Sequence, residues 1–319
     1  MRVLITGGAG YIGTSLITHL LHQGHEAVCL DPHAHELPAL LDFPEPNATN
    51  IEAVVGSVLD GDLVARLARS CDGIVHLAAL VGAPACDADP EQARRLNIDG
   101  TRSLVAAAPR DIPLVVASTC SVYGRVRAAI CTEEEPTSPL SLYAETKAVA
   151  ERLVTERGGV ALRFVTLYGV SPRFRWDLLL HTFLRLAARG ERLDLFDPGA
   201  YRPLLHVHDA ARALLFSLEQ FPRLSGSIFN VACTAPALTK LQLAESIRRF
   251  VPFEINMDAQ NFDPDQRDYR VSSEKIEAMG YWWTVDFDRA LPIIFDRVCR
   301  SLGQENQIWP FEYRCRRSA

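Results

Sequence analysis

Tyr143 and Lys147 form a pair whose residue types and spacing indicate chemistry. They lie in a stretch with helical character, and residues four apart share one face of a helix, so the phenol and the ammonium can meet at one site. A free tyrosine has a pKa of about 10, so a tyrosine that acts as a base near neutral pH needs roughly 4 kcal/mol of preferential phenolate stabilisation. A neighbouring lysine can supply part of it. The pair predicts proton transfer by Tyr143, assisted by Lys147.

A glycine-rich run, GGAGYIG at 7–13, stands between a predicted strand at 3–6 and a predicted helix. Gly7 allows a tight turn, Gly10 lets a pyrophosphate approach the backbone, and Gly13 lets the helix pack closely on the sheet. The start of the helix offers free N–H groups and the positive end of its dipole to phosphates. The run therefore predicts a dinucleotide-binding turn.

Asp31 ends the second predicted strand. A carboxylate there can accept hydrogen bonds from both ribose hydroxyls and repels a 2′-phosphate, which favours NAD over NADP. The same residue could instead cap a helix or form a turn, and the sequence leaves both interpretations open.

Short apolar runs alternate with helical patterns through the first half of the chain, which predicts an α/β fold with a parallel sheet covered on both faces. Such sheets bind ligands outside the carboxyl ends of their strands. Thr119 stands at such an end, where its hydroxyl can meet a substrate oxygen. The predicted strands are 3–6, 27–30, 53–55, 73–79, 113–119, 160–166 and 227–231; helices are predicted from Asp89 towards Ala107, at 141–155 and at Ala210–Leu218, with Asp209 as the cap of the last.

The composition excludes several classes of protein. The chain has 319 residues, 48% of them hydrophobic, and a net charge of −6, which disfavours non-specific binding of nucleic acid. No apolar run reaches the roughly 18 residues of a membrane span, and the N-terminus reads as a core strand rather than a signal peptide. Eight scattered cysteines form no metal or disulfide pattern, so we expect reduced thiols, no metal site and a cytoplasmic location.

These motifs together resemble the extended branch of the short-chain dehydrogenase/reductase superfamily, the NAD-dependent nucleotide-sugar epimerases and dehydratases. The resemblance rests on GGAGYIG at 7–13, HLAA at 76–79, Asn97, STCSVYG at 118–124, YAETK at 143–147 and RPLLHVHD at 202–209. It implies a Rossmann-type, doubly wound NAD-binding domain at 1–168 plus about 203–232. It also implies a smaller C-terminal lobe at about 169–202 and 233–319 that binds a nucleotide diphospho-sugar, and a homodimer.

The resemblance also assigns roles. Tyr143 would be the base, Lys147 would hold the nicotinamide ribose, and Thr119 would bridge Tyr143 and the sugar hydroxyl. The cofactor-binding set is Gly7, Gly10, Tyr11, Ile12, Gly13, Asp31, Ser57, Val58, Leu77, Ala78, Ala79, Asn97, Ser118, Tyr143 and Lys147; the substrate-binding set is Val81, Thr119, Cys120, Ser121, Tyr143, Thr166, Arg173, Arg202 and Arg267.

Cys120 and Ser121 separate the possible reactions. Sugar 4,6-dehydratases of this family carry Asp and Glu at these positions, and related decarboxylases favour Glu at the second, so the lack of carboxylates favours an epimerase acting through a keto, most simply 4-keto, sugar. A dehydratase that uses the Cys120 thiol as its acid remains an alternative, as do a net NAD(H)-dependent oxidoreductase and a non-catalytic NAD-binding relative.

Other residues depart from the family pattern. Thr166 replaces an Asn, and Ser57 replaces an Asp that meets adenine. For the diphosphate we expect Arg202 and Arg267, and Arg173 or Arg175 could do the same work, since guanidinium groups suit phosphate. His206 and His208 flank a valine, and a catalytic or metal-binding role for them is the less favoured interpretation.

Overall fold

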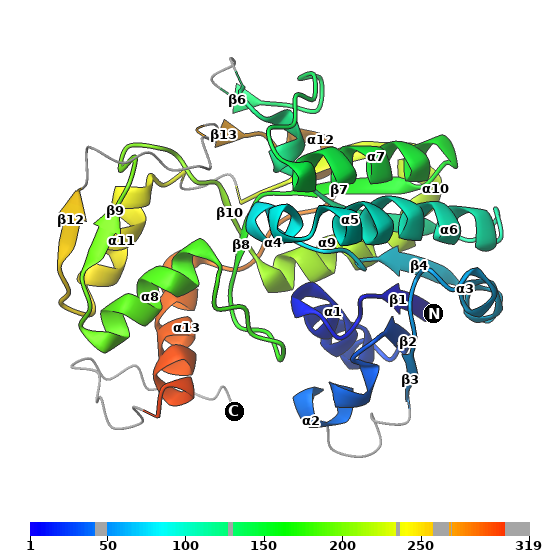
Figure 1. The fold of residues 1–319 in the computed structure, drawn as a ribbon, viewed down its shortest axis with the longest axis horizontal. Helices are drawn as coiled ribbons and strands as arrows, with labels where there is room; N and C mark the ends of the chain where they lie inside the picture. The colour runs from blue at the N-terminus through cyan, green and yellow to red at the C-terminus, as the bar shows by residue number, and fades with distance from the viewer. Residues whose placement is uncertain (42–49, 127–129, 234–236, 258–267, 269, 304–319) are drawn as a thin grey trace.

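Seven parallel strands form one sheet in a computed structural model of the chain, which describes residues 1–41, 50–126, 130–233, 237–257, 268 and 270–303 (Figure 1). The strand order is β11-β7-β5-β4-β1-β2-β3, and every neighbouring pair is parallel. The predicted parallel α/β sheet is confirmed. Its strands are β1 (Arg2–Thr6), β2 (Glu26–Asp31), β3 (Ile51–Val55), β4 (Gly73–His76), β5 (Leu114–Thr119), β7 (Val160–Phe164) and β11 (Ile228–Val231).

Helices cover both faces of this sheet. Alternate residues of a strand point to opposite faces, and here both sets are apolar and are buried by helices. Val3 and Ile5 of β1 belong to a core with α1 (Tyr11–His22) and α9 (Val207–Glu219). Leu4 between them belongs to a second core on the other face. That face is covered by α3 (Gly61–Ala68), α6 (Gly100–Ala107) and α7 (Leu142–Glu156). The strands are apolar throughout because both of their faces are buried.

The helix predicted from Asp89 towards Ala107 is continuous but not regular. The Asp89 side chain accepts a hydrogen bond from the N–H of Gln92 and caps α5 (Pro90–Arg94), as predicted. A π-helical turn, η3 (Arg95–Asp99), then leads into α6. Such turns often lie at functional sites, and this one contains Asn97.

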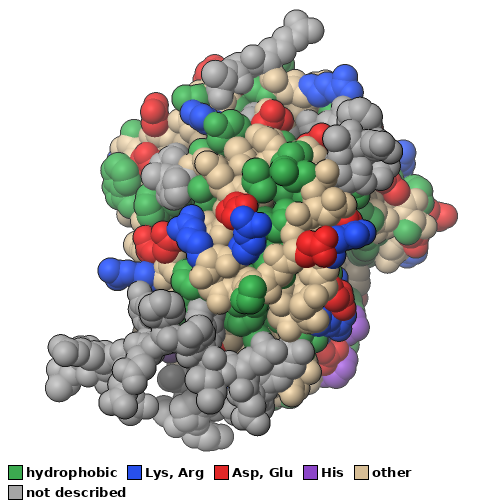
Figure 2. All heavy atoms as spheres, turned by 90° about the vertical axis from the view of Figure 1, so that its left-hand side faces the viewer, with side chains coloured by type: hydrophobic (Ala, Val, Ile, Leu, Met, Phe, Trp, Pro, Cys, Tyr) green, Lys and Arg blue, Asp and Glu red, His purple; other side chains and the backbone are tan. Residues whose placement is uncertain are grey.

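A separate hydrophobic core lies beside the sheet, built by segments far apart in the chain (left side of Figure 1). Its centre includes Leu184, Leu243 and Ile294. Figure 2 looks onto this end, where charged side chains of both signs are interspersed. The elements are α8 (Leu179–Arg189), β9 (Leu193–Leu195), α11 (Lys240–Arg248), β12 (Ile255–Met257) and α13 (Phe287–Ser301).

Three short parallel strand pairs lie outside the main sheet among the described residues, and β9 with β12 is one of them. β8 (Thr166–Tyr168) pairs with β10 (Leu204–His206), and β6 (Ile130–Cys131) pairs with β13 (Arg270–Val271). The strand predicted over 160–166 therefore ends two residues early in the main sheet, and Thr166 belongs to the β8–β10 pair.

Asp209 does not cap α9 as predicted. His206 is the N-cap, and Asp209 lies within the first helical turn, 1% exposed. Its carboxylate accepts hydrogen bonds from the N–H and hydroxyl of Thr284 and from the N–H of Val285, and it pairs with Arg212. It thus fastens the segment before α13 to α9, a contact that local sequence does not reveal.

The remaining elements are short turns of helix that connect the layers. They are η1 (Ala34–Glu36), α2 (Leu37–Leu41), α4 (Ala83–Ala88), η4 (Cys120–Tyr123), α10 (Phe221–Leu224) and α12 (Glu274–Glu277). Within the described ranges, no helix combines the length and apolarity that a membrane crossing requires.

Candidate active site

The predicted chemical residues gather at the carboxyl edge of the sheet. The glycine-rich turn follows β1, Asp31 ends β2, residues 77–81 follow β4, and Thr119 ends β5. The strands are parallel and adjacent, so these ends share one edge. Helix α7, which carries Tyr143 and Lys147, packs against β5 and η4. This is the edge where parallel sheets bind ligands.

The glycine-rich turn is shaped by close backbone approaches. Gly7 has a φ of 74°, and a Cβ there would lie 2.6 Å from the nitrogen of Ala78. A Cβ on Gly13 would lie 2.5 Å from the carbonyl oxygen of Gly8, so α1 can pack on the turn only with glycine there. Gly10 is the N-cap of α1 and provides no side-chain cap. The first N–H groups of α1 are therefore free of a side-chain cap and suited to phosphate oxygens.

Gly13→Ala is expected to weaken NAD binding by about tenfold or more, because the added methyl overlaps the Gly8 carbonyl and must displace the turn; such overpacking costs roughly 1–3 kcal/mol. Isothermal titration of cofactor-free protein with NAD measures the change. Gly199→Ala is the matched control, since nothing lies within 4 Å of its Cβ position. Equal NAD affinity in both variants would show that the close packing at Gly13 does not shape the cofactor site.

Asp31 is 8% exposed and braces the turn. Its Oδ2 accepts from the N–H of Ala9 at 3.2 Å and its Oδ1 from the N–H of His33 at 2.8 Å. The turn-forming interpretation therefore describes part of its role. Each carboxylate oxygen has two lone pairs, so these contacts leave acceptor capacity for ribose hydroxyls.

Tyr143 and Lys147 lie one helical turn apart near the start of α7. The Ser141 side chain caps this helix by accepting from the N–H of Ala144 at 3.3 Å. Tyr143 is half-buried, and Lys147 is 5% exposed. Burial lowers the pKa of Lys147 to about 8, although Glu151 and Cys86 raise it. Lys147 is thus still mostly protonated at neutral pH and can stabilise a phenolate.

Thr119 is 7% exposed, and its hydroxyl is oriented by Ser121. Its Oγ1 accepts from the N–H of Ser121 at 3.1 Å and lies 2.9 Å from the Ser121 hydroxyl. Two hydroxyls thus stand together at the end of β5. The predicted roles of both as substrate contacts remain predictions that this geometry allows.

Cys120 faces away from this edge, into the core. It is 2% exposed, its thiol donates to the carbonyl oxygen of Arg163 at 3.3 Å, and it lies 3.9 Å from Oδ1 of Asn230. These contacts direct the thiol towards β7 and β11. The placement argues against the predicted substrate contact of Cys120 and against its role as a catalytic acid.

Asn97 acts as a brace between two parts of the site. Its Oδ1 accepts from the N–H of Leu80 at 2.7 Å, and its Nδ2 donates to the Leu80 carbonyl and to Thr146 Oγ1. Both amide hydrogens are therefore used by the protein. Asn97 ties the loop after β4 to α7, and a direct cofactor contact remains a prediction.

Arg173, predicted as a substrate contact, is bonded to the glycine-rich turn and to η1, and its contact with substrate remains a prediction. Its Nε donates to the carbonyl of Ala9 at 3.0 Å, and its Nη2 pairs with Glu36 at 2.6 Å. Nearby, Ser171 Oγ donates to the Tyr11 carbonyl at 2.6 Å, and the Tyr11 hydroxyl donates to the Gly169 carbonyl at 2.8 Å. Residues 169–173 thus fasten onto the glycine-rich turn.

Arg175, predicted only as an alternative contact for the diphosphate, lies near the predicted base. Burial is the largest single influence on the pKa of Arg175 and lowers it, but the hydrogen bond and charge of Asp177, with the phenols of Tyr143 and Tyr11, together outweigh burial and raise the pKa. The charge of Arg175 therefore interacts with both phenols. No local motif marks this residue, because its loop follows β8 while Tyr143 lies on α7.

The other predicted substrate residues lie around β8 and β10. Arg202 is 4% exposed and donates to the Tyr201 carbonyl at 3.1 Å. Thr166 donates its N–H to the Pro203 carbonyl at 3.2 Å, so it stands beside the segment that carries this arginine. Arg267 falls outside the described residues. His206 is largely buried, and burial lowers its pKa to about 4, which leaves it almost wholly unprotonated near neutral pH.

The structure places the remaining predicted cofactor residues, and Val81 of the substrate set, in different surroundings. The backbone of Leu77 and Ala78 borders the glycine-rich turn, as the close approach at Gly7 shows, whereas Val81 of the substrate set is 40% exposed. The side chains of Val58 and Ser118 are buried and turned towards α6 and α7, respectively. A cofactor contact of either residue remains a prediction. For Ser57, Ile12 and Ala79, cofactor contact remains a prediction.

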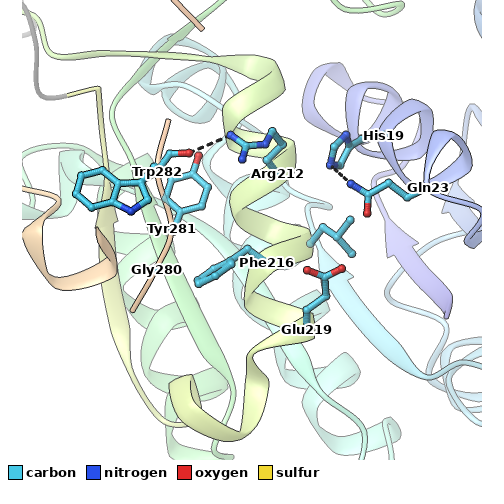
Figure 3. A pocket seen from close by; sticks show the side chains of 9 residues that line it. His19, Gln23, Arg212, Phe216, Glu219, Gly280, Tyr281 and Trp282 are labelled. Atoms are coloured by element: carbon cyan, nitrogen blue, oxygen red, sulfur yellow. Dashed lines mark hydrogen bonds between the residues drawn. The ribbon is translucent and has the colours of Figure 1, made fainter. Parts of the chain in front are cut away.

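A small pocket between α1, α9 and residues 280–282 does not belong to this site (Figure 3). It is lined by polar and aromatic side chains, among them His19, Arg212, Glu219 and Trp282, and by none of the predicted site residues. The cation of Arg212 is already bound by Asp209, the Trp282 carbonyl and Thr284. We therefore assign the chemistry to the sheet edge rather than to this pocket.

Comparison with known proteins agrees with this geometry. The profile of the NAD dependent epimerase/dehydratase family matches residues 3–232. The low-salt glycan biosynthesis protein Agl12 of Haloferax volcanii is 30% identical over 93% of this chain and 98% of its own length. The dTDP-glucose 4,6-dehydratase of Streptomyces niveus is 29% identical over 77% of this chain and 76% of its own. The UDP-glucose 4-epimerase of Azospirillum brasilense is 29% identical over 71% of each.

The fold is also that of a solved structure. The UDP-glucuronic acid 4-epimerase of Bacillus cereus, crystallised with UDP-glucuronic acid and NAD, superposes with a TM-score of 0.82 at 23% identity. The superposition covers 94% of this chain and 100% of that one, which confirms the Rossmann-type fold. With the glycine-rich turn, the tyrosine–lysine pair and these matches together, the chain belongs to the NAD dependent epimerase/dehydratase family, whose cofactor is NAD.

Proposed function

We propose that this protein is an epimerase of a nucleotide diphospho-sugar that acts through a transient keto sugar, most simply oxidised at C4. The observation that carries the proposal is the Tyr143–Lys147 pair at the sheet edge, with Lys147 buried on the tyrosine's helix and still mostly protonated at neutral pH. To remove a hydroxyl proton and return it, the site needs a base, here Tyr143, and a cation that stabilises the deprotonated base, here Lys147.

The chain's own residues perform the proton steps in this proposal. Tyr143 takes the proton from the sugar hydroxyl and later returns it, while Lys147 stabilises the phenolate and Thr119 hydrogen-bonds the same sugar oxygen. When bound, NAD supplies the hydride acceptor and donor. Inversion of the configuration at the oxidised carbon requires only that the keto sugar rotate in the site, so that its opposite face is reduced.

Residues 120 and 121 favour epimerisation over loss of water. Neither is a carboxylate, and the Cys120 thiol is directed into the core. A dehydratase needs an acid and a base besides the tyrosine to remove water from neighbouring carbons. The similarity to a UDP-glucose 4-epimerase supports the same choice, although a dehydratase relative is equally similar.

The proposal includes a place for the rest of the substrate. The nucleotide diphosphate would lie between the sheet edge and the smaller lobe (about 169–202 and 233–319), where the buried Arg202 can meet a phosphate. It also keeps the predicted homodimer, whose test is the molar mass in solution by light scattering.

The experiment is an incubation of purified protein with UDP-, GDP-, dTDP- and CDP-sugars that carry deuterium at C4, followed by chromatography and mass spectrometry. A new peak of unchanged mass that retains the deuterium is expected, because the hydrogen that leaves C4 returns to it. Tyr143→Phe in the same panel controls for contaminating enzymes.

Other products would replace the proposal with a named alternative. Loss of water would identify a dehydratase, and loss of carbon dioxide from a uronic acid sugar would identify a decarboxylase. Loss of two hydrogens with consumption of added NAD would identify a net oxidoreductase.

A further inference from the structure

A buried ion pair joins α7, the helix of the proposed catalytic residues, to β7. Glu151 is 3% exposed and stands one helical turn after Lys147 on the buried face of α7. The guanidinium of Arg163 on β7 donates to both carboxylate oxygens, from Nε to Oε1 at 2.9 Å and from Nη2 to Oε2 at 2.7 Å. The hydroxyl of Ser118 on β5 also donates to Oε1. A bidentate pair with a third donor fixes the carboxylate in one position.

This pair connects the elements that carry the proposed chemistry. Ser118 directly precedes Thr119 at the end of β5, and Glu151 lies on the helix of Tyr143. Arg163 also lies over the ring of Tyr123, with 4.6 Å between its guanidinium carbon and the ring centroid. A shift of Glu151 would therefore change the position of the Thr119 hydroxyl relative to α7.

The titratable groups that interact with Lys147 lie on three elements. Glu151 lies on its own helix, Cys86 faces it from α4, and His76 faces it from β4. His76 is uncharged near neutral pH, since burial and then Lys147 lower its pKa to about 3. The pKa of Lys147 falls to about 8 because of burial, and Glu151 is the larger of the two influences that raise it.

We propose that Glu151 is a positioning residue that keeps Lys147 charged in its buried site and holds the strand end that carries Thr119. This deepens the proposed function, on which its catalytic consequence rests. The geometry that carries it is the i, i+4 spacing of Lys147 and Glu151 and the contact of Glu151 with Ser118.

The charge of Lys147 can be measured without any reaction. The chain has three lysines, Lys147, Lys240 and Lys275, so lysine-selective isotope labelling gives three side-chain NMR signals. Lys147→Arg assigns the signal by its loss. Glu151→Gln is expected to lower the titration midpoint of Lys147 by about one to two pH units, because a nearby opposite charge has been removed. The other two midpoints are expected to stay unchanged.

An unchanged midpoint for Lys147 in Glu151→Gln would overturn the proposal, whatever the protein catalyses. Glu151→Asp retains the charge and is expected to keep the midpoint near that of the wild type. If Glu151→Gln does not fold, Glu151→Gln combined with Arg163→Gln removes both charges and avoids leaving one buried and unpaired. A downward shift of the Lys147 midpoint that is smaller than in Glu151→Gln is then expected, because the loss of the Arg163 cation acts in the opposite direction.

The catalytic consequence is a change in the pH profile of turnover on the substrate found above. In Glu151→Gln, kcat is expected to fall by about tenfold or more at pH 8.5 and to recover in part at pH 6.5, where Lys147 is protonated again, with KM little changed. Asp209→Asn is the matched control: Asp209 is also a buried carboxylate paired with an arginine, but on α9. It is expected to lose stability without a change in the profile, and the same profile change in both variants would count against the proposal.

Discussion

Tyr143→Phe is expected to lower turnover by about 10²–10⁴-fold while NAD stays bound, because it removes only the oxygen that carries the proton. Phenylalanine keeps the ring and its packing at the start of α7, and the glycine-rich turn lies on a different element. The loss should therefore appear in kcat, with KM changed much less. Product chromatography at saturating substrate measures turnover, and the protein's absorbance after gel filtration and denaturation measures retained NAD.

Tyr123→Phe provides a matched control for that substitution. Tyr123 lies in η4, 1% exposed, and its hydroxyl donates to Asn230 in the core at 2.6 Å. The loss of this buried hydrogen bond is expected to cost about 1 kcal/mol of stability and little turnover. If Tyr143→Phe kept wild-type turnover, another group would have to move the proton, and the proposed mechanism would be wrong.

Acidification is expected to destabilise the fold steeply between pH 6.5 and 5, before most carboxylates titrate. His76 is 1% exposed between the hydroxyls of Thr6 and Thr101, and His181 is fully buried between the Gly169 N–H and the Arg175 carbonyl. Burial is the main cause that lowers their pKa values, to about 3 for His76 and about 4 for His181.

The sign follows from the direction of these shifts. Below pH 6.5 these two histidines bind protons in the unfolded chain but remain unprotonated in the folded chain. The stability that is fully present above pH 6.5 is therefore lost as the pH falls towards the folded-state pKa values. Each such histidine removes up to about 1.4 kcal/mol per pH unit, so the two together remove up to about 3 kcal/mol per unit. That is a large share of the roughly 5–15 kcal/mol of a typical domain.

Urea unfolding at pH 7.5, 6.5, 5.5 and 5 measures this dependence. His76→Gln offers an amide that can both donate and accept, so it is expected to flatten the slope by about one proton while lowering stability at pH 7.5. His35→Gln is the control, because His35 is exposed and its replacement should leave the slope unchanged. A wild-type stability that stayed constant down to pH 5 would show that the buried histidines do not govern acid unfolding.

Local patterns predict much of the fold and the glycine-rich turn. The strands around β1, the cap at Asp89 and the helix of Tyr143 and Lys147 depend on residues close in sequence, and each is present. The role of Asp209 differs from the predicted cap, and the ion pair of Arg173 could not be predicted, because their partners Thr284 and Glu36 lie far away in the chain. Such contacts depend on the topology of the fold.

Cys120 and Glu151 show two different limits of sequence reading. The direction of the Cys120 thiol depends on the short helical turn after β5, whose course no periodic pattern specifies. Glu151 does leave a signal, because positions 143, 147 and 151 repeat at a spacing of four on one helix face. Its partners, Ser118 and Arg163, become evident only when β5 and β7 are placed side by side.

The strand order has a consequence for how the chain folds as it is synthesised. β1 is made first but lies in the interior of the sheet, whereas β11, made after residue 227, completes one edge by pairing with β7. Pairings between segments so distant in sequence form slowly. Until β11 leaves the ribosome, β7 presents an unpaired edge, and Asn230 is not yet available to Tyr123. A chain that stops before residue 228 therefore leaves β7 as an unpaired edge strand, which can pair with other chains and aggregate.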